Sequence, residues 1–312
     1  MSRYIIRRLL LIIPTTLLVV LLVFLIMNIT PGDPGRMILG VGQGVTQEAV
    51  DALNHSLGMD RPVMERYFSY IWNILHLDFG LSYHSRQPVL DTLVKSFPIT
   101  FKLAFLSILV TVVVGIPLGI ISAARRYSVL DGTLTVVALV VASVPGFWLG
   151  IMLILIFSLK LGLLPTSGVG TLKHYILPVL TLALPNAAFL LRITRVTMLE
   201  TLRQDYIRTA RAKGASEKRV IFRHALKNTL LPVVTTLGLS FANLLGGAIV
   251  VEAVFGLPGL GEVILDALVL KDVPVVMASV ILIAVLFMLI VLIVDILYAY
   301  IDPRIKAQFG GR

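Results

Sequence analysis

Long apolar stretches, separated by shorter polar segments, dominate the sequence. Six of them lie near residues 9–29, 99–123, 133–158, 176–198, 229–251 and 275–300. Each approaches or exceeds the roughly 20 residues that an α-helix needs to cross a bilayer. Several contain proline, which helix bundles tolerate because neighbouring groups satisfy the freed carbonyls. The pattern predicts an all-α integral membrane protein with six transmembrane helices.

The first apolar stretch follows three arginines, Arg3, Arg7 and Arg8. A basic start before an apolar run is also typical of a cleaved signal peptide. This run is longer than the apolar region of a typical signal peptide, and it lacks a clear small-residue cleavage site. We therefore expect residues 1–30 to form a first spanning helix that is not cleaved.

Residues 31–96, between the first two apolar stretches, are predicted to be a small folded insertion outside the membrane. It begins with the turn sequence PGDP. Thr46 is suited to cap a helix that ends at Gly58 and has an apolar face. Asp60 is suited to cap a second amphipathic helix. The insertion is thus expected to be helical and folded, and not a linker.

A second external segment, residues 252–274, combines turn-forming residues with a short apolar helix near residues 263–270. Such a segment either caps the external mouth of the protein, dips back into the membrane, or forms a plain structured loop. The residues expected to form this external gate or loop are Gly256, Pro258, Gly259 and Gly261.

Composition agrees with a membrane protein, because 57% of the residues are hydrophobic and only 14% are charged. The net charge of +10 would also suit nucleic acid or anionic lipid. However, 18 of the 27 Lys and Arg residues fall on one side of the predicted spans, as expected for cytoplasmic loops. We therefore expect both termini in the cytoplasm, lipid around the spans and no nucleic-acid partner.

Several kinds of chemistry have no support in the sequence. There is no cysteine, and the five histidines lack metal-binding spacing. Neither a phosphate-binding GxxxxGK[ST] loop nor a GxSxG nucleophile motif occurs. We therefore predict no catalytic residue, no metal site and no cofactor on this chain, and we do not expect an enzyme.

The most polar part of the chain is the loop at residues 200–228. Residues 208–228 alone contain seven of the 27 Lys and Arg residues. Asp205 and Ser216 are suited to cap two short helices, and Gly214 between them can adopt the positive φ that ends a helix. Small residues around the corner would let another protein approach closely, namely Ala210, Ala212, Gly214 and Ala215.

This loop, "RTARAKGASEKRVIFRHALKNTLLPV", resembles the cytoplasmic EAA loop of ATP-binding-cassette (ABC) importer permeases. The usual glutamate is replaced, because Arg208, Thr209 and Ala210 stand where Glu-Ala-Ala precedes the glycine. That departure resembles the dipeptide and oligopeptide branch. Similar segments are the first 34 residues with PGDP, "HYILPVLTLAL", "VVEAVFGLPGLG" and "IVDILYAYIDPRI". The resemblance thus covers nearly the whole chain.

The resemblance implies a B-type permease subunit in the cytoplasmic (inner) membrane of a prokaryote. Residues 97–312 would form the five-helix core of a type I ABC importer. Its partners would be a second homologous permease, two ATPase subunits that bind ATP and Mg, and an extracytoplasmic solute-binding protein. The solute would be a di- or oligopeptide, carried by alternating access. Alternatives are nickel chelates, glutathione or another small solute in the same architecture.

Other classes have less support from the residues. A channel or secondary transporter working alone is one alternative, but proton- or ion-coupled carriers usually place several ionisable residues in mid-span, and this chain has essentially none there. An intramembrane hydrolase would need a nucleophile with a base, or a metal site, and neither occurs.

The resemblance also assigns residues to coupling with an ATPase. The segment from Arg203 to Asn228 would seat in the ATPase and act as a lever. Its candidate contacts are Asp205, Tyr206, Arg208, Ala210, Arg211, Lys213, Gly214, Ala215 and Arg219.

Polar residues within or near the spans are candidates for the translocation path. Asp295 is expected to pair with Arg192 or Arg195 for structural reasons. Asn186 and Asn243 suit either the path or hydrogen bonds between helices. The full set of path candidates is Ser143, which lies at an expected kink, Asn186, Asn243 and Glu252.

Overall fold

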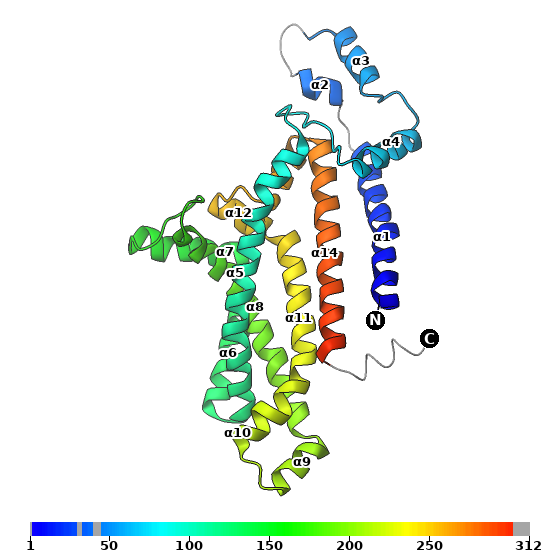
Figure 1. Cartoon of the computed structure of the whole chain (residues 1–312). Coiled ribbons are helices and arrows are strands. Elements are labelled where there is room, and N and C mark those ends of the chain that lie inside the picture. The colour runs from blue at the N-terminus through cyan, green and yellow to red at the C-terminus, as the bar shows by residue number, and fades with distance from the viewer. Residues whose placement is uncertain (1, 30–32, 40–44, 302–312) are drawn as a thin grey trace.

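The computed structural model describes residues 2–29, 33–39 and 45–301. These residues form helices and connecting turns, with no β-strand among them (Figure 1). The longest helices are α1 (Ser2–Ile29), α5 (Val89–Ala124), α8 (Leu172–Leu202), α11 (Leu226–Gly247) and α14 (Val273–Ile301). The shorter elements are α2 (Pro34–Leu39), α3 (Gln47–Ser56), α4 (Val63–Leu75), α6 (Val129–Ser143), α7 (Gly146–Leu153), η1 (Ile154–Lys160), α9 (Asp205–Ala212), α10 (Glu217–Arg219), η2 (Val220–Ala225), α12 (Ile249–Phe255) and α13 (Leu260–Val269). The two η elements are π-helical.

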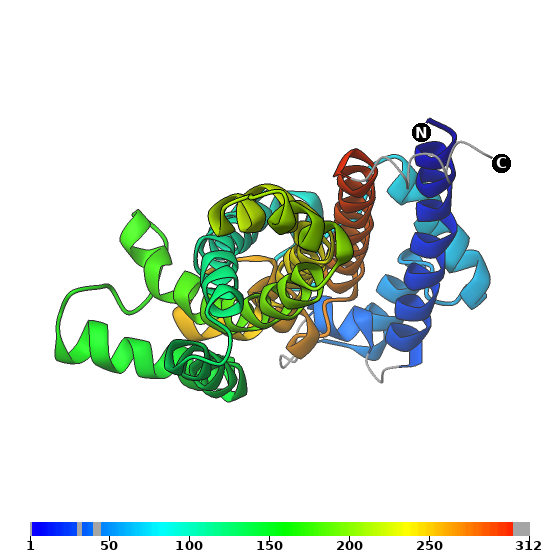
Figure 2. The same ribbon diagram turned by 90° about the horizontal axis from the view of Figure 1, so that it is seen from below.

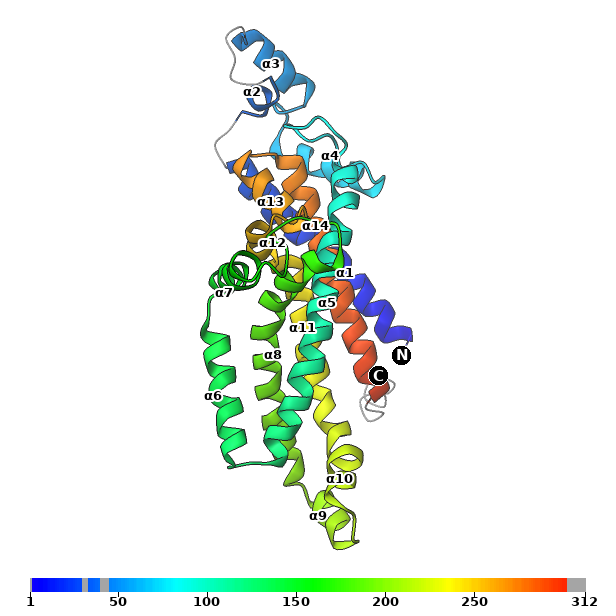
Figure 3. The same ribbon diagram turned by 90° about the vertical axis from the view of Figure 1, so that its left-hand side faces the viewer.

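Five of the described helices are long and apolar enough to cross a membrane, and they correspond to five of the six apolar stretches. The fifth stretch was expected to run to residue 251, but α11 ends at Gly247 and α12 begins at Ile249. The third stretch is broken into α6 and the pair of α7 and η1, which are bent by 99° from one another. The predicted all-α membrane fold is confirmed. Figure 3 shows α6 upright beside α8, with α7 turned aside above it.

The break after α6 is sharper than the kink expected from the sequence. Pro145 has no backbone N–H and disfavours helical geometry in the residue before it. Val144 accordingly adopts an extended conformation with φ −77° and ψ 127°. One continuous span over residues 133–158 is therefore not what the structure contains.

Close packing of α5 against α8 forms the centre of the bundle. A Cβ atom at Gly115 would lie 2.9 Å from the Ala187 carbonyl oxygen. One at Gly119 would lie 2.6 Å from Thr194 Cβ. Small residues at such crossings let membrane helices approach closely, as these glycines do here. A side chain at Gly238 of α11 would likewise overlap Val294 of α14.

Helix α1 lies at the edge of this bundle. Figure 2 shows α14 between α1 and the group formed by α5, α8 and α11. The outer half of α1 packs on α14 and α4 through a cluster that includes Val20, Phe24, Tyr67 and Met277. The Tyr67 hydroxyl also donates a hydrogen bond to the Leu17 carbonyl oxygen at 3.0 Å. The insertion is therefore fastened to α1 as well as to the core.

Local capping chemistry explains α3 of the insertion but not α4. The Thr46 hydroxyl accepts a hydrogen bond from the Ala49 N–H at 3.3 Å, and Gly58 has a φ of +69°. Both features were predicted. Asp60 does not cap α4, because Pro62 occupies the N-cap position. Two residues of the predicted PGDP turn, at positions 31 and 32, lie outside the described residues.

A buried aspartate at the start of α14 holds the end of the insertion, and the sequence pattern did not reveal it. Asp272 is 3% exposed. It accepts hydrogen bonds from the Ser82 hydroxyl at 2.5 Å, the Tyr83 N–H at 3.1 Å and the His84 N–H at 3.3 Å. The turn before α5 is thereby fixed to the external end of α14.

Candidate functional site

The predicted coupling loop forms the end of the molecule opposite the insertion (Figure 1). Helix α9 ends at Ala212, and Gly214 follows with a φ of +80°. This is the left-handed conformation that glycine adopts without steric cost. The predicted role of Gly214 as the corner is confirmed. A Cβ at this position would meet no atom within 4 Å, so backbone conformation alone demands the glycine.

Buried apolar side chains anchor the corner to the membrane helices. Ile207 of α9 and Val220 of η2 are both fully buried. They pack in one cluster with Ile120 of α5 and Met198 of α8. Burying an aliphatic side chain contributes about 1.5–3 kcal/mol, so the loop is a fixed extension of the bundle and not a loosely tethered loop.

An ion pair joins the two sides of the corner. The Arg211 guanidinium donates to both carboxylate oxygens of Glu217, at 2.7 and 3.1 Å. Bidentate pairs of this kind fix orientation as well as adding energy. Arg211, predicted as a contact for an ATPase, therefore already has a partner within the chain.

The helix caps differ from those expected. Gln204 takes the N-cap position of α9, and Asp205 is its first residue, with a side chain that is almost fully exposed. Ser216 takes the N-cap position of α10, but its side chain makes no capping hydrogen bond. The expectation that Asp205 and Ser216 cap through their side chains is wrong, although the helix starts lie within one residue of those predicted.

The second arm of the corner is not a separate short helix. The chain from α10 through η2 runs into α11 without interruption, and residues 217–246 qualify together as one membrane-length helix. We expected a short helix before the fifth span. The difference matters mechanically, because a displacement of α10 is a displacement of the end of α11.

The other predicted coupling residues lie on the surface of this corner. Arg208, Lys213 and Arg219 are exposed, and Arg208 lies 3.9 Å from Asp205. The Tyr206 hydroxyl accepts a hydrogen bond from the Asn228 amide at 2.6 Å. Ala210 and Ala215 are half-buried and face each other through a backbone hydrogen bond of 3.1 Å.

Glu252, predicted to line the translocation path, is fully buried in this structure. Its carboxylate accepts hydrogen bonds from the Thr100 hydroxyl at 2.6 Å, the Gly261 N–H at 2.8 Å and the Glu262 N–H at 3.2 Å. Thr100 in turn accepts from the Leu260 N–H at 2.8 Å. Instead of facing an open path, Glu252 ties α5, α12 and the N-terminus of α13 together. We call Glu252, Thr100 and these three amides the external latch.

The predicted turn residues of the external segment surround this latch. Gly256 ends α12 with a φ of +55°. Side chains at Gly259 and Gly261 would lie within 2.5 and 2.8 Å of the Glu252 carboxylate, so only glycine fits there. Pro258 lies in the turn that leads to α13. The expected short helix near residues 263–270 is confirmed as Leu260–Val269.

The remaining path candidates sit on separate helices. The Ser143 hydroxyl donates to the Leu139 carbonyl oxygen at 2.8 Å, at the break after α6. The Asn186 amide donates to the Leu182 carbonyl oxygen at 2.8 Å within α8. Asn243 is exposed on α11. Their role in a path stays a prediction.

Two ion pairs correct the expected partner of Asp295. Asp295 lies 3.1 Å from Arg8 of α1, and not beside Arg192 or Arg195. Arg195 instead binds Asp131 of α6 through two hydrogen bonds of 2.6 and 2.8 Å. Asp131 was missed, although Ser128 three residues earlier gives the Ser-x-x-Asp signal of a helix start.

Among the described residues, no group of three or more His, Asp or Glu side chains is arranged to hold a metal ion.

The sequence matches two family descriptions that together cover most of the chain. Residues 115–307 match "Binding-protein-dependent transport system inner membrane component". Residues 1–104 match "Binding-prot-dependent transport system membrane comp, N-term".

Curated relatives include the glutathione transport system permease protein GsiC of Escherichia coli strain K12. It is 44% identical over 306 residues, which are 98% of this chain and 99% of the relative. The protein of the same name from Shigella flexneri serotype 5b (strain 8401) has the same identity and coverage.

Solved structures share the fold at lower identity. The MetNI methionine ABC transporter in an inward-facing conformation has a TM-score of 0.58 and 22% identity, covering 68% of this chain and 96% of that chain. An amino acid ABC transporter crystallised with histidines has a TM-score of 0.54 and 14% identity, covering 68% of this chain and 94% of that chain.

Proposed function

Because the chain belongs to the family of binding-protein-dependent transport system inner membrane components, we propose that it is driven by ATPase subunits through the corner at Gly214. The chain is a permease subunit of an ABC importer, in the dipeptide, oligopeptide and glutathione branch. The corner of α9, Gly214 and α10 is the contact on which an ATPase acts.

The observation that carries this proposal is the connection of the corner to the membrane helices. Ile207 and Val220 hold it against α5 and α8, and α10 continues into α11. A force applied to the corner is therefore applied to three spanning helices at once. Closure of the ATPase subunits would rock these helices between inward-open and outward-open arrangements, which is alternating access.

The exposed surface of the corner is suited to a protein contact. Its arginine and lysine side chains are exposed, and Gly214 between them has open space where a Cβ atom would lie. Individual surface charges contribute only about 0–1 kcal/mol. We therefore assign the main role to shape at Gly214, Ala210 and Ala215. Arg208, Lys213 and Arg219 have a supporting role. The remaining residues of the proposed contact surface are Asp205, Tyr206 and Arg211.

For the solute we propose glutathione or a short peptide. The curated relatives named above are glutathione permeases that match over nearly their whole length, and glutathione is itself a small peptide. A second homologous permease, two ATPases with bound ATP and Mg, and an extracytoplasmic binding protein complete the transporter that we propose.

The proposed topology follows the charge distribution. The corner carries the densest group of Lys and Arg residues, which supports a cytoplasmic location by the positive-inside rule. The N-terminal end of α1 then lies on the cytoplasmic side and the insertion outside (Figure 1). We place the chain in the inner membrane of a prokaryote.

Uptake by the reconstituted transporter tests this function. The two permeases, the ATPases and the binding protein are placed in liposomes with ATP inside, and labelled glutathione and a labelled dipeptide are offered outside. We expect ATP-dependent accumulation of at least one of them. Accumulation that needs no ATP would contradict the proposal.

A further inference from the structure

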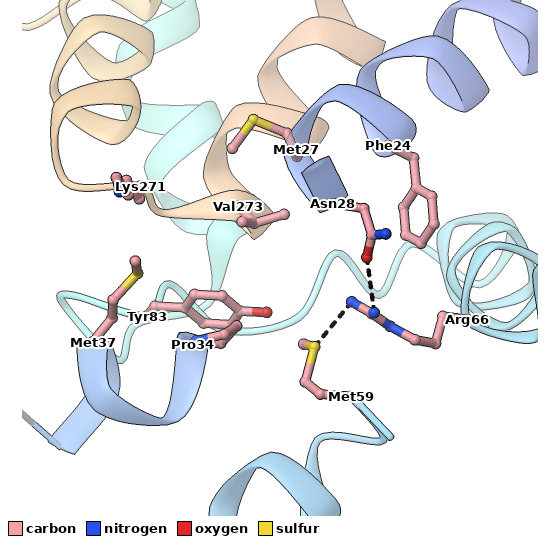
Figure 4. Close-up of a pocket in the computed structure, with 10 residues that line it drawn as sticks. All are labelled: Phe24, Met27, Asn28, Pro34, Met37, Met59, Arg66, Tyr83, Lys271 and Val273. Carbon is pink, nitrogen blue, oxygen red and sulfur yellow. Dashed lines mark hydrogen bonds between the residues drawn. The ribbon is translucent and has the colours of Figure 1, made fainter. Parts of the chain in front are cut away.

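Two adjoining cavities lie at the external end of the chain, between α1, the insertion and the start of α14. Figure 4 shows the residues that line the smaller one. Their volumes are about 220 and 360 Å³. They share the wall residues Phe24, Met59, Arg66, Tyr83 and Val273. Helices α5, α8 and α11 contribute no residue to either wall, so these cavities are separate from the centre of the bundle.

A half-buried cation stands between the two cavities. The Arg66 guanidinium donates to the Asn28 side-chain oxygen at 2.9 Å, contacts Met59 Sδ at 2.9 Å and lies 5.8 Å from the centre of the Phe24 ring. None of these partners is a carboxylate, and within the described residues Arg66 forms no ion pair. A partly buried charge without a counter-charge is costly, and a bound anion would relieve that cost.

A second polar group is left without a partner at the same place. The Tyr70 hydroxyl is buried and makes no hydrogen bond, and Tyr70 lines the larger cavity together with Tyr83. Burial raises the pKa of Tyr70. Burial also raises the pKa of Tyr83, to about 12, although the charge of Arg66 opposes this rise. Both phenols are therefore protonated at neutral pH and are available as hydrogen-bond donors. Figure 4 shows the Tyr83 hydroxyl on the side of the cavity where Arg66 lies.

The rest of the smaller cavity is apolar and adaptable. Met27, Met37 and Met59 contribute thioether side chains to its wall. Methionine is flexible and polarisable, so it can pack against apolar groups of different shape. Pro34 and Met37 of the insertion also line this cavity.

We propose that the paired cavities form an external site for a small carboxylate-bearing solute. Arg66 binds the carboxylate, Tyr70 and Tyr83 donate hydrogen bonds to it, and the methionines take the apolar part. Together the cavities fall within the size range of typical ligand pockets, roughly 300–1,000 Å³. Peptides end in a carboxylate, so the inference rests on the proposed function for the choice of peptide probes.

Direct binding to the importer tests the site. The assembled transporter, without binding protein or nucleotide, is placed in nanodiscs and titrated with labelled glutathione and a labelled dipeptide. We expect saturable binding of a peptide that is lost when its C-terminal carboxylate is replaced by an amide. Equal binding of the amide would overturn the proposal, as would a phospholipid found tightly bound in the cavity.

Two tyrosines of α4 provide a matched pair of variants. Tyr70→Phe removes a hydroxyl that has no partner, so we expect an unchanged melting temperature and about five- to tenfold weaker binding. Tyr67→Phe removes a hydroxyl bonded to Leu17, so we expect a lower melting temperature and unchanged binding. Equal binding by wild type and Tyr70→Phe would contradict the role of that phenol.

Substitution of Arg66 tests the charge itself. Arg66→Gln should weaken binding more than tenfold, and Arg66→Lys should retain part of it because the charge is kept. Binding unchanged in Arg66→Gln would overturn the site. If peptides bind but are not taken up by the complete transporter, the proposed function fails and the site stands. If uptake is normal and the nanodiscs bind no peptide, the site alone fails.

Discussion

The corner at Gly214 and the external latch are stabilised by opposite means. At the corner of Gly214, apolar side chains are buried and the charged groups remain on the surface. At the external latch, a carboxylate is buried and satisfied by a hydroxyl and backbone amides. Apolar contacts tolerate small displacements, whereas a buried network is satisfied in only one arrangement. The corner can therefore be displaced by a partner, whereas the latch holds α5, α12 and α13 in one arrangement.

The largest expected loss of stability follows from breaking the latch. Glu252→Ala leaves the Thr100 hydroxyl and the amides of Gly261 and Glu262 without their acceptor. Each unsatisfied buried group costs about 1–3 kcal/mol, so we expect a loss of about 3 kcal/mol or more. Thermal unfolding of the solubilised protein measures it. The matched control is Glu262→Ala, since the Glu262 side chain is outside the latch, and an equal loss in both variants would refute the assigned role.

Removing an anchor of the corner should have the next largest effect. Ile207→Ala deletes a fully buried side chain, which typically costs about 2–5 kcal/mol. Here the loss should fall on the corner, so that solute uptake per ATP hydrolysed declines. Val129→Ala, at an exposed position at the same end of the molecule, should change neither the stability nor the solute uptake per ATP hydrolysed. Normal coupling in Ile207→Ala would show that the anchor is dispensable.

Steric crowding at the latch predicts a smaller effect. A methyl group at Gly261 would lie 2.6 Å from the Ile249 Cα atom, so Gly261→Ala should lower stability by about 1–3 kcal/mol. Gly132→Ala has open space around it in α6 and should be neutral or stabilise by up to about 1 kcal/mol. The difference between the two melting temperatures is the measurement, and no difference would contradict the crowding at Gly261.

The ion pair across the corner should matter least. Arg211→Gln removes a pair in which both side chains are partly exposed, for an expected loss of about 0.5 kcal/mol. An equal loss of stability in Glu217→Gln and in the double variant would identify the ion pair as the cause. Losses that simply add in the double variant would mean that the two residues act separately.

Local chemistry made part of this structure predictable. Gly214 as a helix end, Thr46 as a cap and Gly58 as a stop each depend on residues within a few positions. The long helices could be predicted from the apolar stretches because these patterns are also local in the sequence. Asp60 failed as a cap because Pro62 fixed the start of α4 two residues later. Such local competition can be decided only when the backbone is known.

Pairings between distant helices could not be predicted in the same way. Glu252 and Thr100 are 152 positions apart, and they meet because α13 packs against both α5 and α12. Asp295 was assigned an arginine of α8, but Arg8 of α1 lies beside it. An ionisable residue near a span signals a need for a partner. It does not say which of several arginines will be nearest.

The central claim is that energy enters the membrane helices through the corner at Gly214. Gly214→Val tests it most directly, because φ there is +80° and no atom lies within 4 Å of the added Cβ. The change therefore strains the backbone of the corner without crowding a neighbour. We predict a transporter that assembles in the membrane and retains basal ATPase activity, but hydrolyses ATP without solute stimulation and accumulates no solute. Wild-type uptake per ATP hydrolysed by this variant in liposomes would contradict the claim.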